Sequence, residues 1–137
     1  MKRITRYKTK GSGVQFDLVF HDLLTIISGE SGVGKTVLFK ALENDSLLGN
    51  IDAICLNYDD TTSGIIDITL KSAKNKLIII DNANVILTPE QMFKISTDRY
   101  NQYIMFAHSI QGMHPSEKSI AELKVKNNKG TLEYVLL

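Results

Sequence analysis

Hydrophobic residues fall into short runs along the chain, and segments with a helical pattern separate several of these runs. The runs predict strands at residues 23–28, 51–58, 76–82 and 102–107. Residues 77–80 are all aliphatic, which is typical of a parallel strand that is covered on both faces. Leu38, Ala41 and Leu42 share one face of a helix that begins at about residue 36. Alternating strands and helices predict a mostly parallel sheet with right-handed crossovers.

The two ends of the chain carry a different pattern, in which apolar and polar residues alternate around turn residues. Residues 4–9 and 14–20 flank a turn at 10–13, and residues 120–126 and 131–136 flank a turn at 127–130. Both pairs predict β-hairpins, and we expect the second hairpin to close one edge of the sheet. The full pattern predicts an α/β three-layer sandwich: a mostly parallel sheet, helices on both faces, and hairpins at the N- and C-terminal ends.

Capping residues mark two further helices. Thr88, Pro89 and Gln91 form a capping box with proline at the first helical position, and they predict a helix that ends near Asp98. Residues 61–63 are hydroxyl-bearing and predict the cap of a helix that ends near Ala73. Residues 110–116 predict a loop, or at most one helical turn.

The composition indicates an ordinary globular chain. Its 137 residues predict one domain over residues 1–137, with 43% hydrophobic and 23% charged residues. A net charge of +1 does not indicate nucleic-acid binding. Cys55 lies in an apolar run and is expected to be a core thiol. Because the sequence shows neither a leader pattern nor an apolar run of membrane-spanning length, we expect a cytoplasmic protein.

A glycine-rich stretch lies between the first predicted buried strand and the helix that follows it. It fits the pattern G-x-x-x-x-G-K-[ST] at every fixed position, and its residues are Gly29, Glu30, Ser31, Gly32, Val33, Gly34, Lys35 and Thr36. The glycines let successive backbone N–H groups point toward an anion, and the helix N-terminus favours the same charge. The motif predicts that Lys35 contacts the β- and γ-phosphates of a nucleotide and that Thr36 binds Mg²⁺. The alternative is a glycine-rich turn that matches by chance.

Polar residues follow the other predicted strands, at the sheet edge where α/β proteins bind ligands. They are Asp59 and Asp60, Asp81 and Asn82, and His108 and Ser109. With the glycine-rich motif and the aliphatic run ending in Asp81, the chain resembles the P-loop NTPase superfamily. It looks most like the AAA-type, RecA-like and ABC-type ATPases, over about residues 23–109.

The resemblance implies roles for several residues. Asp81 corresponds to the Walker B carboxylate and would hold Mg²⁺ beside Thr36. The strand at 102–107 would lie between the strands at 23–28 and 76–82, so that His108, or Ser109, faces the γ-phosphate as a sensor. A loop histidine without a ligand is the alternative.

The chain departs from that family at the position after Asp81. ATP-hydrolysing members often carry Glu there to orient or deprotonate the attacking water, whereas Asn82 can hold a water but cannot take its proton as a carboxylate does. Asp59, or Asp60, is the candidate substitute, unless the pair only caps a turn. The ABC signature LSGGQ is absent, and Arg99 is interpreted as a helix-end cation rather than an arginine finger.

These features predict a Mg²⁺-dependent ATP-binding protein, either a slow ATPase or an ATP-driven switch that acts through a protein partner or a homo-oligomer. A nucleotide-binding module with little catalysis is the first alternative. A small-molecule kinase is less favoured because the chain has few arginines to clamp phosphates. ATP is preferred to GTP because no guanine-reading N-K-x-D run is present, not because of a positive adenine motif.

Overall fold

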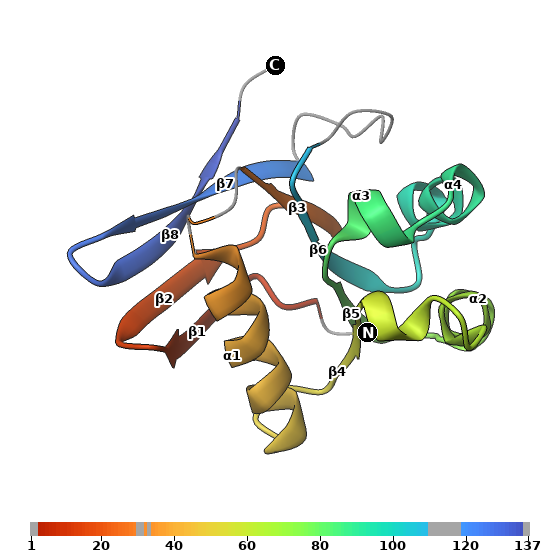
Figure 1. Cartoon of the computed structure of the whole chain (residues 1–137), viewed down its shortest axis with the longest axis horizontal. Coiled ribbons are helices and arrows are strands. Elements are labelled where there is room, and N and C mark those ends of the chain that lie inside the picture. The colour runs from red at the N-terminus through yellow and green to blue at the C-terminus, as the bar shows by residue number, and fades with distance from the viewer. Residues whose placement is uncertain (1–2, 30–31, 33, 110–118, 136–137) are drawn as a thin grey trace.

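A mixed sheet with helices packed on it organises the chain, as a computed structural model that describes residues 3–29, 32, 34–109 and 119–135 shows (Figure 1). Within these residues, eight strands lie in the order β1-β2-β8-β7-β3-β6-β5-β4. The strands are β1 (Arg6–Gly11), β2 (Val14–Val19), β3 (Leu24–Ser28), β4 (Ala53–Leu56), β5 (Leu77–Ile80), β6 (Gln102–Ala107), β7 (Ile120–Lys126) and β8 (Lys129–Tyr134). The helices are α1 (Lys35–Leu47), the 3₁₀ helix Tyr58–Asp60, α2 (Ile65–Ser72), α3 (Ala83–Ile86) and α4 (Pro89–Thr97).

The sequence prediction of an α/β fold with a mostly parallel core and a hairpin at each end is confirmed. Strands β7, β3, β6, β5 and β4 pair with one another in parallel, whereas β1 with β2 and β7 with β8 form antiparallel hairpins. Strand β6 lies between β3 and β5, as predicted. No helix in the described part of the chain is long and apolar enough to cross a membrane.

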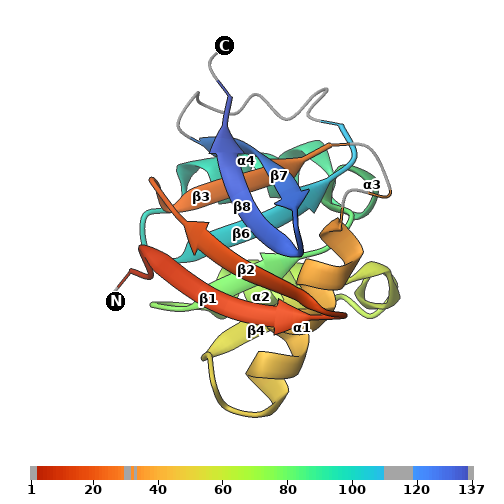
Figure 2. The ribbon, with the colours of Figure 1, turned by 90° about the vertical axis from the view of Figure 1, so that its left-hand side faces the viewer.

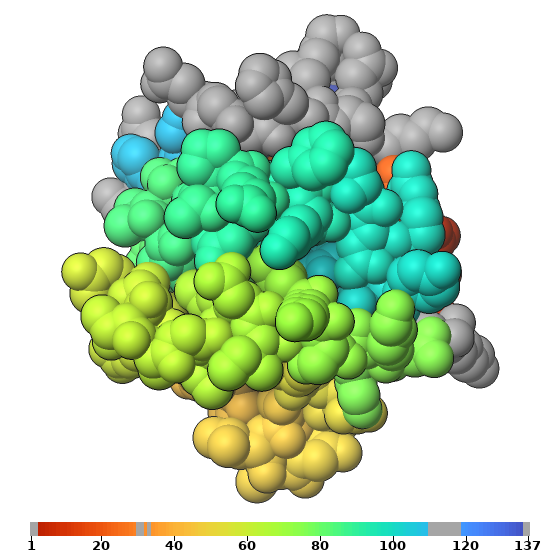
Figure 3. Space-filling model, turned by 90° about the vertical axis from the view of Figure 1, so that its right-hand side faces the viewer, coloured from red at the N-terminus to blue at the C-terminus, as the bar shows by residue number. Residues whose placement is uncertain are grey.

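Successive residues of the central strands enter two different hydrophobic clusters, because side chains alternate across a sheet. Ile27 and Ile79 pack in the cluster under α1, with Leu38 and Phe106. Ile26 and Ile78 pack in the other cluster, under α2, α3 and α4. Figure 3 shows α2, α3 and α4 side by side over that face. Helices therefore cover both faces of the central strands.

Helix α1 also ties the two outer strands of the sheet together. The hydroxyls of Tyr7 and Thr9 on β1 donate to Oδ2 of Asp45, at 2.8 and 2.6 Å. On the other side, Ser46 Oγ donates to the carbonyl of Ala53 on β4, at 2.8 Å. Burial and the bond to Asp45 raise the pKa of Tyr7 to about 12. The helix that follows the glycine-rich loop is thus fixed to both edges of the sheet.

The prediction that the C-terminal hairpin closes an edge is wrong. Strand β7 pairs in parallel with β3, and β8 pairs in parallel with β2, so this hairpin lies inside the sheet (Figure 2). Its apolar face, with Leu123 and Leu132, continues the cluster under α1. The outer strand on this side is instead β1, whose Lys8 and Lys10 are exposed, as suits an edge.

Several predicted boundaries also change. The C-terminal turn is Asn127-Asn128, two residues with φ of 53° and 58°, rather than four residues, and Gly130 belongs to β8. Helix α2 begins after Gly64, and the hydroxyls expected to cap it donate backward to the carbonyls of Tyr58 and Asp60. The capping box at Thr88 is confirmed. Helix α3 was not predicted, and residues 110–116 lie outside the described residues.

Candidate functional site

The glycine-rich loop joins the end of β3 to the start of α1. Gly29, Gly32 and Gly34 have φ of 136°, 89° and 101°, a region that residues with a side chain rarely adopt. A Cβ on Gly34 would lie 3.3 Å from Cγ2 of Val125 on β7, whereas a Cβ on Gly32 would meet no atom of the described residues within 4 Å. The loop therefore needs glycine for its backbone path, and the described residues leave open space over Gly32. Glu30, Ser31 and Val33 lie outside the described residues.

The first turn of α1 is suited to an anion. Gly34 is its N-cap, no described side chain caps it, and its first turn contains no acidic residue. The N-terminal N–H groups of a helix need an acceptor from outside the helix, and the helix dipole favours a negative one. An anion held by the loop would supply the hydrogen-bond acceptor and also the negative charge.

A cavity of about 330 Å³ opens beside this turn at the carboxyl ends of β3, β5 and β6. Its described lining residues are Gly32, Gly34, Lys35, Thr36, Val37, Asp81, Asn82, Phe106, Ala107 and His108. Residues separated by up to 76 positions in the chain thus face one space because parallel strands end at the same edge.

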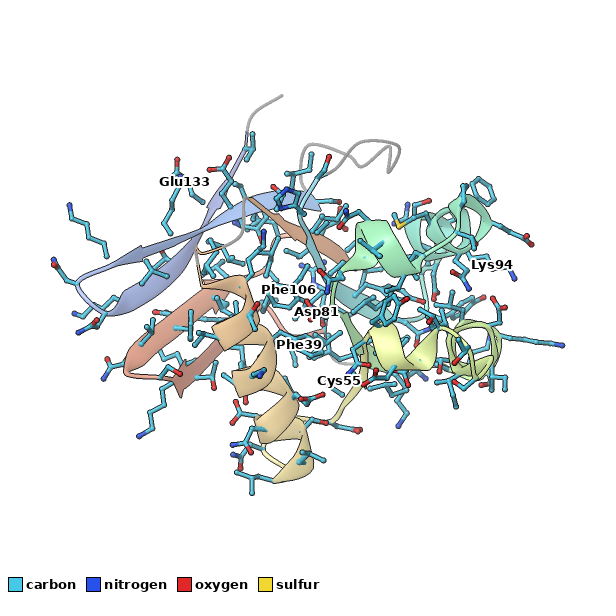
Figure 4. The ribbon with its side chains drawn as sticks, viewed as in Figure 1. Phe39, Cys55, Asp81, Lys94, Phe106 and Glu133 are labelled. Atoms are coloured by element: carbon cyan, nitrogen blue, oxygen red, sulfur yellow. The ribbon has the colours of Figure 1, made fainter. Side chains whose placement is uncertain are left out.

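Lys35 and Asp81 interact electrostatically across this cavity. Partial burial lowers the pKa of the Lys35 ammonium, and the nearby Asp81 carboxylate opposes that shift. Burial likewise raises the pKa of Asp81, against the backbone N–H of Asn82, which donates to Oδ1 at 3.0 Å, and against Lys35. Lys35 also donates to the carbonyl of Gly29. Figure 4 shows Asp81 between α1 and α3. Both charges are held partly out of water, a common property of functional sites.

Helix α3 follows β5 in the chain and contacts the end of β6 through a hydrogen bond. Asn82, exposed and with φ of 49°, is its N-cap, so the chain turns sharply after Asp81. Asn84 in this helix accepts the backbone N–H of His108 through Oδ1, at 3.0 Å. The bond positions His108 at the rim of the cavity. Sequence reasoning missed Asn84, because an Asn inside a four-residue helix carries no signal of its own.

Asp59 is exposed and is not among the described residues that line the cavity. It lies in the 3₁₀ helix after β4, where its backbone N–H donates to Oδ1 of Asn57 at 2.9 Å. Asp60 completes that capping box by accepting the backbone N–H of Asn57 at 2.8 Å. The structure therefore brings together Lys35, Thr36, Asp81, Asn82 and His108, and leaves Asp59 and Ser109 outside the lining.

Among solved structures, the chain is similar to replication initiator proteins. AMPPCP-bound DnaA from Aquifex aeolicus matches with a TM-score of 0.50 and 19% identity, over 76% of this chain and 41% of that one. DnaA bound to AMPPCP and single-stranded DNA matches equally well. The chain therefore has a fold similar to that of DnaA over about three quarters of its length.

A DNA replication initiation factor matches at the same TM-score, with 18% identity over 77% of this chain and 42% of that one. The chain thus spans less than half of the length of these proteins. Identity at this level shows the fold alone. No protein-family model matches the sequence, and no curated protein matches it.

Proposed function

We propose that the chain binds Mg·ATP at the glycine-rich loop and acts as a slow ATPase or an ATP-driven switch. The observation that carries the proposal is the convergence of Gly32, Gly34, Lys35, Thr36 and Asp81 on one cavity. The choice of ATP is supported by the DnaA structures of similar fold, which contain the ATP analogue AMPPCP.

The residues present suit a triphosphate. Positive-φ glycines turn backbone N–H groups toward a bound anion, and the open space over Gly32 leaves room for it. The Lys35 ammonium adds a full charge, and phosphate oxygens would stabilise its charged form against the burial that lowers its pKa. This chain's contribution to binding would therefore be an anion cradle made of backbone N–H groups and the Lys35 ammonium.

Mg²⁺ would be held by Thr36 and Asp81. Within the described residues there is no cluster of three or more His, Cys, Asp or Glu side chains that could hold a metal ion. Asp81 is the one carboxylate among the described lining residues. A site this sparse suits Mg²⁺ that is shared with phosphate oxygens and retains several waters. The ion, when bound, would neutralise phosphate charge, and we expect it to enter with the nucleotide.

Hydrolysis is expected to be slow because the cavity's described lining offers no second carboxylate to accept a proton from water. Asn82 can orient a water through its amide, and His108 can donate to a phosphate oxygen. The same observation favours the alternative function, a nucleotide-binding module with little catalysis whose bound state is read by a protein partner or by another copy of the chain. Nucleotide that stays intact for many hours at full occupancy favours that alternative.

The test of binding is thermal unfolding with and without Mg·ATP. At a ligand concentration about 100 times Kd, binding to the folded state alone adds about 2.7 kcal/mol of stability. We expect Lys35→Ala to lose this stabilisation and Lys40→Ala to keep it, because Lys40 is an exposed lysine of the same helix. Equal stabilisation of both variants would contradict the proposal. Phosphate release equal to that of Lys35→Ala would exclude the ATPase but leave the binding module.

A further inference from the structure

A second hollow lies on the other side of the phosphate loop from the candidate cavity. This hollow has a volume of about 540 Å³ and shares Gly32, Gly34 and Val37 with the first. Its remaining described walls come from the two hairpins: Val14 and Phe16 on β2, and Leu123, Lys124 and Val125 on β7. Figure 1 shows the hairpins on one side of the first turn of α1, and β5, β6 and α3 on the other. The loop thus separates a charged cavity from a largely apolar one.

The two hollows differ in chemistry in the way that the two ends of a nucleotide differ. Asp81, Lys35 and His108 border the first, whereas Lys124 is the one charged residue in the described lining of the second. The charged end of Lys124 bonds to Glu122 at 2.9 Å. Val125 is 41% exposed, whereas Phe16 and Leu123 are buried, so Val125 is the part of this wall that a ligand can reach most easily. A hollow of this size, whose described side chains are apolar apart from Lys124 and which shares Gly32 and Gly34 with the anion cradle, suits a flat heterocycle on a phosphate chain.

A larger hollow elsewhere is a weaker candidate for such a ligand. It has a volume of about 720 Å³ and lies by β1 and the end of α1, with Lys8, Lys10, Asp17 and Asp45 in its lining. None of its described lining residues belongs to the glycine-rich loop. A ligand whose phosphates occupy the loop could not extend into it directly, whereas the hollow at Val125 begins at Gly34 itself.

We propose that the nucleoside end of the bound triphosphate lies between the two hairpins, in contact with Val14 and Val125. The inference rests on the proposed function. The hollow's described lining side chains are apolar except for Lys124, so no neutral hydrogen-bonding side chain distinguishes one base edge from another. A site that hydrogen-bonds a substrate group rejects analogues strongly, while an apolar pocket discriminates weakly. The described lining therefore predicts that a purine is selected by shape and contact, with similar affinity for ATP and GTP.

The experiment measures Kd by calorimetry for Mg·ATP, Mg·GTP and inorganic tripolyphosphate, which carries the phosphates without a nucleoside. The test variant is Val125→Asn, which keeps the side chain's size but makes the wall polar. Val19→Asn is the matched control, because Val19 is also on a strand, is 44% exposed and does not line the hollow. Lys35→Ala shows whether the phosphates of each ligand bind at the glycine-rich loop.

We expect Val125→Asn to raise the Kd of ATP about fivefold, which is the loss expected for a partly buried apolar contact. The Kd of tripolyphosphate should stay unchanged, and Val19→Asn should bind both ligands as the wild type does. ATP and GTP should differ by less than about tenfold. Unchanged ATP affinity in Val125→Asn, or a preference for one purine of about a hundredfold or more, would overturn the inference while leaving phosphate binding intact.

Photolabelling of the wild-type chain with 8-azido-ATP provides a second measurement that needs no variant. The label should attach to peptides that contain residues 14–16 or 123–125 and be displaced by excess ATP. Attachment at β5 or α3 instead would overturn the placement. If neither ATP nor tripolyphosphate binds, or if Lys35→Ala binds both normally, then the proposed function itself fails and the inference falls with it.

Discussion

Asp81 directly follows β5, whose four residues are all buried, and the fold holds its carboxyl group partly out of water. Desolvation disfavours the charged form, and this raises the pKa of Asp81 above 3.8 despite Lys35 and the backbone N–H of Asn82. The unfolded chain therefore loses this proton at a lower pH than the folded chain does. As the pH rises from about 3.8 through the folded pKa, this group lowers the free energy of unfolding.

Asp81→Asn should therefore stabilise the nucleotide-free protein slightly at pH 7, by less than about 1 kcal/mol, as is common when a functional charge is removed. The gain should disappear when the pH falls below the carboxyl pKa of the unfolded chain, because both proteins are then neutral at this position. Urea unfolding at pH 7 and at about pH 3.5 measures this difference.

The matched control is Asp52→Asn, which removes a carboxylate that is 90% exposed and lies 3.7 Å from the ammonium of Lys76. Because an exposed ion pair contributes little to stability, this variant should not show the gain at pH 7. A loss of stability at pH 7 in Asp81→Asn would mean that the carboxylate stabilises the fold, and it would contradict the electrostatic account of the cavity. The same variant is expected to weaken Mg·ATP binding, since it removes a ligand of the metal.

At the scale of elements, the C-terminal hairpin of β7 and β8 determines which residues lie beside the glycine-rich loop. Strand β8 lies against β2, with Gly130 opposite Phe16 in the register. A Cβ on Gly130 would lie 2.5 Å from Cδ1 of Phe16, whose side chain is buried in the cluster under α1. The sequence pattern places Gly130 in a turn, but it lies in β8. There a glycine is required, because the space that a side chain would fill is occupied by the ring of Phe16.

Gly130→Ala should reduce the free energy of unfolding by about 2 kcal/mol, because a fully buried ring must move to accept the methyl group. Urea unfolding measures the change. Thr131→Ala is the control, since Thr131 is exposed on the same strand and its loss should cost less than about 0.5 kcal/mol. If Gly130 were an exposed turn residue, alanine would be neutral or slightly stabilising, and that result would contradict the interior position of the hairpin.

Local patterns predicted the elements better than their pairing. The aliphatic run in β5 and the capping box at Thr88 are signals within a few residues, and both are confirmed. The position of the β7–β8 hairpin depends on which distant strand it pairs with, and alternation of apolar residues fits an edge or an interior strand equally well. Helix α3 escaped prediction because its four residues are too few to show a period.

At the scale of the whole molecule, the sheet order brings the N-terminal and C-terminal hairpins to the glycine-rich loop. The candidate cavity could be predicted because parallel strands end at one edge, so Asp81 and His108 had to approach Lys35. The hollow on the other side could not be predicted, since Val14 and Val125 meet there through the pairing of β2 with β8 and of β7 with β3.

Helix α1 connects the glycine-rich loop to both edge strands of the sheet. Its first turn follows directly on the loop. Its last turns form hydrogen bonds with β1 through Asp45 and with β4 through Ser46. The loop is thus supported by contacts at both edges of the sheet, which suits a site that is formed before its ligand binds.

The most direct test of the central claim is a titration of the ¹⁵N-labelled chain with Mg·ATP, followed through its backbone amide resonances. The account predicts the largest shifts at Gly32, Gly34, Lys35 and Thr36, with smaller shifts at Asp81, and it predicts their loss in Lys35→Ala. Unperturbed loop amides at saturating nucleotide, or shifts confined to the hollow between β1 and the end of α1, would contradict it.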